Sequence, residues 1–93
     1  MPWFRNRPVV IQADFFDGSR ESADGLKRMH GARIALEMEF DPRGAHEWTG
    51  KLIVIDGQTH MIATAGDWIL RGVEGALYPV AGNVFKRAYE EIT

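Results

Sequence analysis

Glycines divide the C-terminal third of the sequence, residues 65–92, into short segments that cannot all belong to one long element. Two short apolar runs, residues 68–71 and residues 76–79, are separated by the glycine-flanked residues 72–75. Glycine adopts the positive φ that tight hairpin connections require, so this pattern predicts a β-hairpin. Pro79 prevents the chain from continuing as a central strand, because proline has no backbone N–H.

One helical turn is predicted after this hairpin. Asn83 stands at the position of an N-cap, whose side chain accepts a hydrogen bond from a free backbone N–H, and residues 84–88 would form one or two turns behind it. Replacing Asn83 with alanine would then cost about 0.5–2 kcal/mol of folding free energy. Trp68 and Phe85 are expected in the core, because a small domain needs such large side chains inside.

A strand and a helix are predicted in the first third of the chain. The β-branched start and near-alternation of residues 9–16 predict a strand, preceded by Pro8 where its missing N–H costs little. Ser22 would cap the helix and Gly31 would end it. The expected buried face of the helix carries three apolar residues at three-residue spacing, namely Ala23, Leu26 and Met29.

Regular alternation of apolar and polar residues predicts a half-buried strand at residues 32–40. Its buried face is expected to carry Ile34, Leu36, Met38 and Phe40, and its other face Glu37 and Glu39. A polar loop that contains His46 and Trp48 is predicted to follow as far as Gly50.

Asp56 and Gly57 form one of the strongest short hairpin signals, and residues 51–55 and 59–63 on either side are expected to be strands. About six short strands, one helix in the N-terminal half and a helical turn near the C-terminus together predict an α+β fold dominated by antiparallel sheet. A chain of 93 residues is expected to form a single domain, residues 1–93.

The composition argues against several classes of protein. The absence of cysteine excludes disulfides and thiol catalysis and is typical of a reducing compartment such as the cytoplasm. Eleven basic and thirteen acidic side chains give a net charge of −2, which disfavours a nucleic-acid-binding surface. No apolar run reaches the length of a signal peptide or a membrane span, so no membrane association is expected.

No cofactor, metal site or catalytic residue is predicted. The spacing of His30, His46 and His60 fits no standard zinc pattern, and His30 is explained by a favourable interaction with a helix C-terminus. Four aspartates stand mostly in turn positions, where they hydrogen-bond to the backbone: Asp14, Asp17, Asp56 and Asp67. An acid–base pair formed in space stays open as an alternative, because spatial pairing is invisible in the sequence.

Two segments resemble a family of small proteins of tailed bacteriophages and prophages. The segments are RPVVIQA at residues 7–13 and GDWILRGVEG at residues 66–75, with Tyr78-Pro79, Phe85 and Tyr89-Glu90 after the second. The chain departs from the family pattern at residues 80–82, and Asn83 stands where an aspartate is usual. The resemblance implies a phage or prophage origin, with the host cytoplasm as the place of action, and it implies no established activity.

One group of candidate binding residues is aromatic. Trp3, Phe4 and Trp48 lie outside the predicted strands, and exposed aromatic side chains beside Arg5 would form a patch for a protein partner. The alternative for Trp3 and Phe4 is that they cover the open end of a small core.

A second group would bind an anion. Arg71 would provide a guanidinium group and Tyr78 a stacking ring, with Lys86 and Arg87 as further cations. The alternative for this segment is structural, because Asp67 beside it is typical of a turn that supports a hairpin.

The leading hypothesis is a small phage accessory protein that is not an enzyme and binds a host or phage protein, for example to counter a CRISPR-type defence. It would act as a monomer or homodimer. The alternatives are a binding module for a small nucleotide signal and a minor structural or assembly protein of the virion. A pocket that combines Arg71 with stacking rings would favour the nucleotide, and an exposed apolar patch would favour a protein partner.

Overall fold

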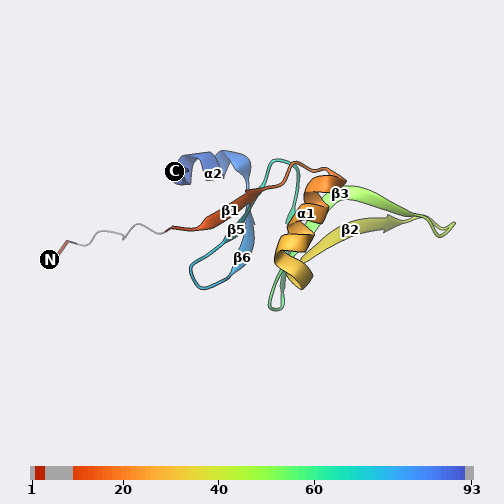
Figure 1. Cartoon of the computed structure of the whole chain (residues 1–93), viewed down its shortest axis with the longest axis horizontal. Coiled ribbons are helices and arrows are strands. Elements are labelled where there is room, and N and C mark those ends of the chain that lie inside the picture. Colours follow the sequence, from red (N-terminus) through yellow and green to blue (C-terminus); the bar gives the residue numbers. More distant parts are fainter. Residues whose placement is uncertain (1, 4–9, 92–93) are drawn as a thin grey trace.

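The computed structural model of the protein describes residues 2–3 and 10–91. Six strands form two three-stranded antiparallel sheets, in the orders β1-β5-β6 and β2-β3-β4, with two helices packed on them (Figure 1). The elements are β1 (Gln12–Phe15), α1 (Arg20–His30), the 3₁₀ turn η1 (Gly31–Arg33), β2 (Ile34–Phe40), β3 (His46–Asp56), β4 (Thr59–Ala63), β5 (Trp68–Arg71), β6 (Leu77–Val80) and α2 (Gly82–Ala88). The predicted α+β class with a dominant antiparallel sheet is confirmed.

Both predicted hairpins are present. β3 and β4 meet at Asp56 and Thr59, and Gly57 between them has a φ of 60°. In the connection between β5 and β6, Gly72 N–H donates to the Ala76 carbonyl oxygen at 2.8 Å, and Gly75 has a φ of 87°. Glycine therefore supplies the positive φ in each turn, as the sequence pattern predicts.

Helix α1 begins earlier than predicted, and its buried face follows the 3.6-residue helical period rather than a strict three-residue spacing. The cap is Ser19 rather than Ser22, and the Ser19 hydroxyl accepts a hydrogen bond from Ser22 N–H at 3.0 Å. Ala23 and Leu26 are buried as expected, but Met29 is 60% exposed, and His30 is buried in its place. The predicted end of the helix is confirmed, because Gly31 donates its N–H to the Lys27 carbonyl oxygen with a φ of 63°.

The core lies where the inner faces of the two sheets meet each other and α1. Its buried residues are Phe16, Ala23, Leu26, Ile34, Leu52, Val54, Ala63, Ile69 and Leu77. Because these residues come from both sheets and from α1, each sheet covers the apolar face of the other.

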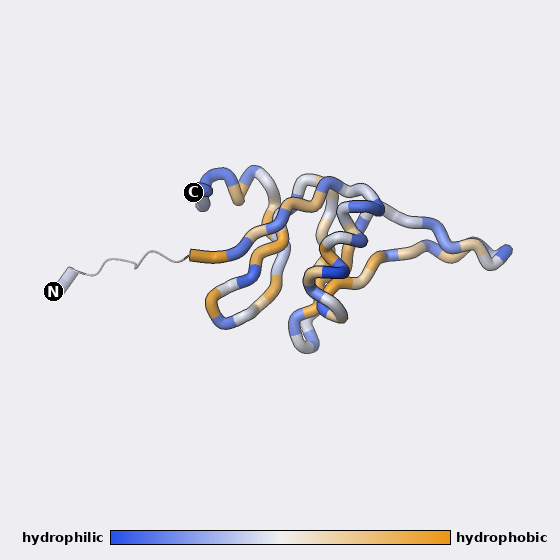
Figure 2. Tube along the Cα trace, viewed as in Figure 1, coloured by the Kyte–Doolittle hydropathy of each residue, from blue (hydrophilic) through white to orange (hydrophobic). Residues whose placement is uncertain are grey.

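The strand β2 follows the predicted alternation only over its first half. Ile34 is buried and Leu36 packs against the core, whereas Phe40 is 70% exposed, which contradicts its predicted place on the buried face. A register irregularity between Leu36 and Met38 interrupts the pairing with β3. Beyond that point the β2–β3 hairpin extends away from the core (Figure 1), and its far end is mostly hydrophilic (Figure 2).

The segment around Trp48 is strand rather than the predicted polar loop. β3 starts at His46, and Met38, Glu39 and Phe40 of β2 pair with it there. Local composition had indicated a loop because these residues are polar, but pairing with β2 satisfies their backbone groups.

Helix α2 packs on part of the outer face of the β1-β5-β6 sheet, through the stack of Phe85 on Trp68. The strand register places Phe15, Trp68, Leu70 and Tyr78 on this face, and Gln12, Asp14, Ile69 and Arg71 on the face toward α1. The predicted cap at Asn83 is wrong: α2 begins at Gly82, its cap is Ala81, and no side chain caps it. Phe85 N–H, which an Asn83 cap would have bound, donates to the Ala81 carbonyl oxygen at 2.9 Å. Asn83 lies exposed in the first turn of the helix.

Arg33 joins the two sheets at the ends of their hairpins. Its Nη1 donates to the Gly75 carbonyl oxygen at 2.7 Å, and its Nη2 donates to Asp56 Oδ1 at 3.0 Å. Gly75 belongs to the β5–β6 connection and Asp56 to the β3–β4 hairpin, so one guanidinium group bridges both loops.

We predict opposite effects for two glycine-to-alanine substitutions. A Cβ at position 82 would lie 2.5 Å from the Gly66 carbonyl oxygen, so Gly82→Ala should destabilise the fold by about 1–3 kcal/mol. A Cβ at Gly25, inside α1, meets only an Arg28 side-chain nitrogen at 3.9 Å, so Gly25→Ala should stabilise by about 0.5–1 kcal/mol. Thermal or urea unfolding of both variants tests this, and equal shifts in the same direction would contradict it.

Candidate functional site

The outer face of the β1-β5-β6 sheet carries a stack of aromatic rings. Trp68 of β5 and Phe85 of α2 lie face to face, with ring centroids 4.3 Å apart and an angle of 12° between the rings. Tyr89 continues the stack, 5.1 Å from Phe85. Trp68 and Phe85 are half-buried rather than fully inside, so their predicted place in the core is wrong. They form a second apolar layer that is open on one side.

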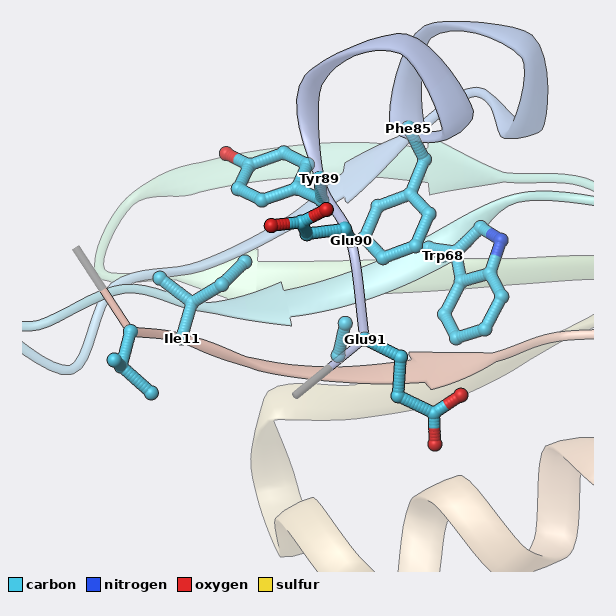
Figure 3. Close-up of a pocket in the computed structure, with 8 residues that line it drawn as sticks. Ile11, Trp68, Phe85, Tyr89, Glu90 and Glu91 are labelled. Atoms are coloured by element: carbon cyan, nitrogen blue, oxygen red, sulfur yellow. The ribbon is translucent and has the colours of Figure 1, made fainter. Parts of the chain in front are cut away.

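A hollow of about 340 Å³ opens beside this stack (Figure 3). Val10, Ile11 and Ala13 form its apolar side, and Trp68, Phe85 and Tyr89 its aromatic side. Glu90 and Glu91 add two exposed carboxylates, and none of the lining residues is basic. We call this hollow the aromatic notch; its chemistry suits an apolar or cationic group rather than an anion.

A second hollow, the polar groove, lies on the other face of the same sheet, beside the end of α1. Its volume is about 470 Å³, and its lining residues are Gln12, Ala13, Asp14, Met29, His30 and Arg71. The His30 side chain is only 3% exposed, and its Nε2 lies 3.6 Å from Asp14 Oδ2. Neither ring nitrogen has a hydrogen-bond partner among the described residues.

The environment of His30 favours the neutral ring. Burial lowers the pKa of His30 below its ordinary value of 6.5, and the Asp14 carboxylate opposes this shift only in part. The positive charges of Arg71 and Arg33 lower the pKa further. The expected interaction of a charged His30 with the helix C-terminus is therefore not supported.

The Asp14–His30 pair has the residue types of a general base and its orienting partner, but not the access. Both ring nitrogens are covered by protein atoms, so neither reaches a molecule in the groove. This geometry favours a structural role for His30 at the base of the polar groove.

The structure separates the two residues expected to share an anionic ligand. Arg71 of β5 pairs with Leu77 of β6 and lies on the same face of the sheet as Leu77. Tyr78 is the next residue along β6, so its side chain lies on the opposite face. Arg71 is exposed at the polar groove, and Tyr78 is half-buried on the outer face. Burial raises the pKa of Tyr78, and the nearby Tyr89 phenol raises it further.

The remaining predicted site residues do not gather in one place. Trp48 is half-buried, and its Nε1 donates to the Gly18 carbonyl oxygen at 3.3 Å, so it does not form the expected exposed patch. Trp3 is 98% exposed, whereas Phe4 and Arg5 lie outside the described residues. Lys86 and Arg87 are exposed in the last turn of α2 and line neither hollow.

Sequence reasoning missed Ile11, Glu90 and Glu91 as components of a hollow. The four-residue spacing of Phe85 and Tyr89, which places both rings on one side of a helical segment, was the available signal for the stack. Nothing local indicated that the start of β1 lies beside Glu90 and Glu91, because that proximity depends on the tertiary fold.

The described residues contain no group of three histidines, aspartates or glutamates arranged to hold a metal ion. In the same part of the chain, no helix combines the length and the apolar character needed to cross a membrane.

Comparisons with protein-family models, with curated proteins and with solved structures find no match to this chain.

We predict that the free energy of unfolding decreases as the pH falls below 6.5. The unfolded chain binds a proton at His30 near its ordinary pKa of 6.5, but the folded protein binds it only at lower pH, so acid favours the unfolded state in that window. His30→Leu should flatten the dependence of the melting temperature on pH between 6.5 and this lower value. His60→Gln, at an exposed position, is the matched control and should leave that dependence in place. The same slope in wild type and His30→Leu would refute this assignment.

Proposed function

We propose that this protein acts by binding, and that the aromatic notch receives an apolar and basic segment of a partner protein. The observation that carries the proposal is the notch itself, in which three stacked half-buried rings lie beside two exposed carboxylates. Aromatic residues are enriched among the side chains that contribute most of the energy of protein interfaces.

The charges around the notch indicate the chemistry of the bound segment. A lysine or arginine side chain would pack its aliphatic part against Phe85 and Tyr89 and direct its cation to Glu90 or Glu91. A neighbouring aliphatic side chain would contact Ile11 and Ala13. The proposed partner segment is therefore basic and apolar.

The nucleotide alternative has less support. A phosphate in the notch would meet Glu90 and Glu91 without a cation among the lining residues. Arg71, the cation expected to bind it, faces the opposite side of the sheet from the stacked rings. Stacking and charge neutralisation would therefore require two separate hollows.

The proposed setting is the cytoplasm of a bacterial host, with the protein as an accessory factor of a tailed phage or prophage. The resemblance of residues 7–13 and 66–75 to that family supports the setting, and a component of a host defence system is the proposed class of partner. A role in virion structure or assembly is the competing proposal, and the identity of the partner segment distinguishes the two.

We predict that peptides selected from a random display library by the purified protein carry lysine or arginine next to an aliphatic or aromatic residue. The double variant Glu90→Lys with Glu91→Lys should bind the selected peptides about tenfold more weakly or worse, because the carboxylates that receive the cation are reversed. Fluorescence anisotropy with the selected peptides measures the loss.

The matched control is Glu47→Lys with Glu74→Lys, which changes the net charge equally at exposed positions that line neither hollow. It should bind the peptides like wild type. Selection of acidic peptides, equal affinity in both double variants, or a nucleotide retained in native mass measurements would overturn the proposal.

A further inference from the structure

The strand β1 is the outer strand of its sheet, and both hollows lie along it. In the order β1-β5-β6, β1 pairs with β5 alone among residues 2–3 and 10–91. Ile11 lines the aromatic notch, Gln12 and Asp14 line the polar groove, and Ala13 between them borders both hollows. The two hollows thus lie on opposite faces of the sheet and meet at β1, with Ile11 just before the strand on one face and Gln12 and Asp14 on the other.

The backbone groups of β1 alternate in the same way. Phe16, directly after β1, donates its N–H to the Asp67 carbonyl oxygen at 2.9 Å and accepts from Gly66 N–H at 2.8 Å. Its backbone groups therefore point toward β5, and by alternation Ala13 and Phe15 direct theirs to the outer edge. An outer edge of this kind is a template for another strand.

We infer that the partner segment binds as an added strand along the outer edge of β1. This inference depends on the proposed function and specifies how the segment is held. An extended peptide there would form main-chain hydrogen bonds with Ala13 and Phe15, and its side chains would enter the two hollows in turn.

The two hollows select different side chains. The aromatic notch takes a lysine, arginine or aliphatic side chain, for the reasons given above. In the polar groove, Arg71 forms no ion pair with any described residue, and the Asp14 carboxylate lies on the same face. A side-chain amide offers an oxygen to Arg71 and an N–H to Asp14, whereas a carboxylate would be repelled by Asp14 and an ammonium by Arg71. The bound strand therefore alternates basic or aliphatic residues with glutamine or asparagine.

The test uses the acetylated and amidated peptide KQIQKQT and versions of it that carry a single backbone N-methyl group. Methylation of an N–H that points to β1 should weaken binding about tenfold or more, whereas methylation of the next N–H, which points away, should change it less than about twofold. The effect must alternate along the peptide, and isothermal calorimetry or fluorescence anisotropy of the full chain measures it.

A variant of the protein tests the same edge. Ala13→Pro removes an N–H that points outward and leaves the pairing with β5, so it should abolish peptide binding while thermal unfolding stays cooperative. The N-methyl series uses the unaltered protein and decides the question if this variant fails to fold.

The outcomes separate this inference from the proposed function. Binding that depends on Glu90 and Glu91 but does not alternate with N-methylation would overturn strand addition and leave the notch proposal standing. If KQIQKQT fails to bind while display-selected basic peptides bind at the notch, the predicted alternation of basic or aliphatic residues with glutamine or asparagine is wrong. Loss of both kinds of binding would overturn the two proposals together. Dimerisation through β1 that the peptide does not compete with would overturn strand addition alone.

Discussion

Burial of apolar side chains between the two sheets is the interaction on which the rest of the structure depends. Phe16 and Ile69 from one sheet region and Leu52 from the other are fully buried in the same core. A three-stranded sheet needs a covered apolar face to be stable, and here each sheet covers the other. Truncating a buried phenylalanine typically costs about 3–5 kcal/mol, a large part of the stability of a domain of this size. The hollows therefore keep their shape only while this shared layer is intact.

The two faces of the β1-β5-β6 sheet have different packing partners, and this explains why both hollows lie on this sheet. Its inner face joins the core through Ile69 and Leu77, while its outer face packs against α2 through Trp68. Neither α1 on the inner face nor α2 on the outer face extends over the whole sheet at the β1 side, so the groove and the notch remain open there. Ala13 and Trp68 belong to paired strands, which hold residues more rigidly than loops do, whereas Glu90 and Glu91 follow the end of α2.

Sequence patterns predicted the hairpins and the α+β class well, because glycine turns and local alternation act over a few residues. They failed where tertiary pairing overrode local preference: His46 and Trp48 are polar-loop residues by composition but belong to a long strand paired with β2. Helix caps were misplaced by two residues at Asn83 and by three at Ser22, and the strict three-residue spacing chose Met29 where the 3.6-residue period of a helix buries His30. The candidate sites were the hardest to predict, since Ile11 and Glu90 meet only through the sheet order.

The bridge formed by Arg33 has a mechanical consequence. A planar guanidinium group that donates from two nitrogens in a fixed geometry restrains the angle between its acceptors as well as their separation. Its acceptors, the Gly75 carbonyl and the Asp56 carboxylate, belong to loops of different sheets. The two sheets are therefore held against twisting past each other at that end. An ammonium group at the same place would act as a tether with free rotation.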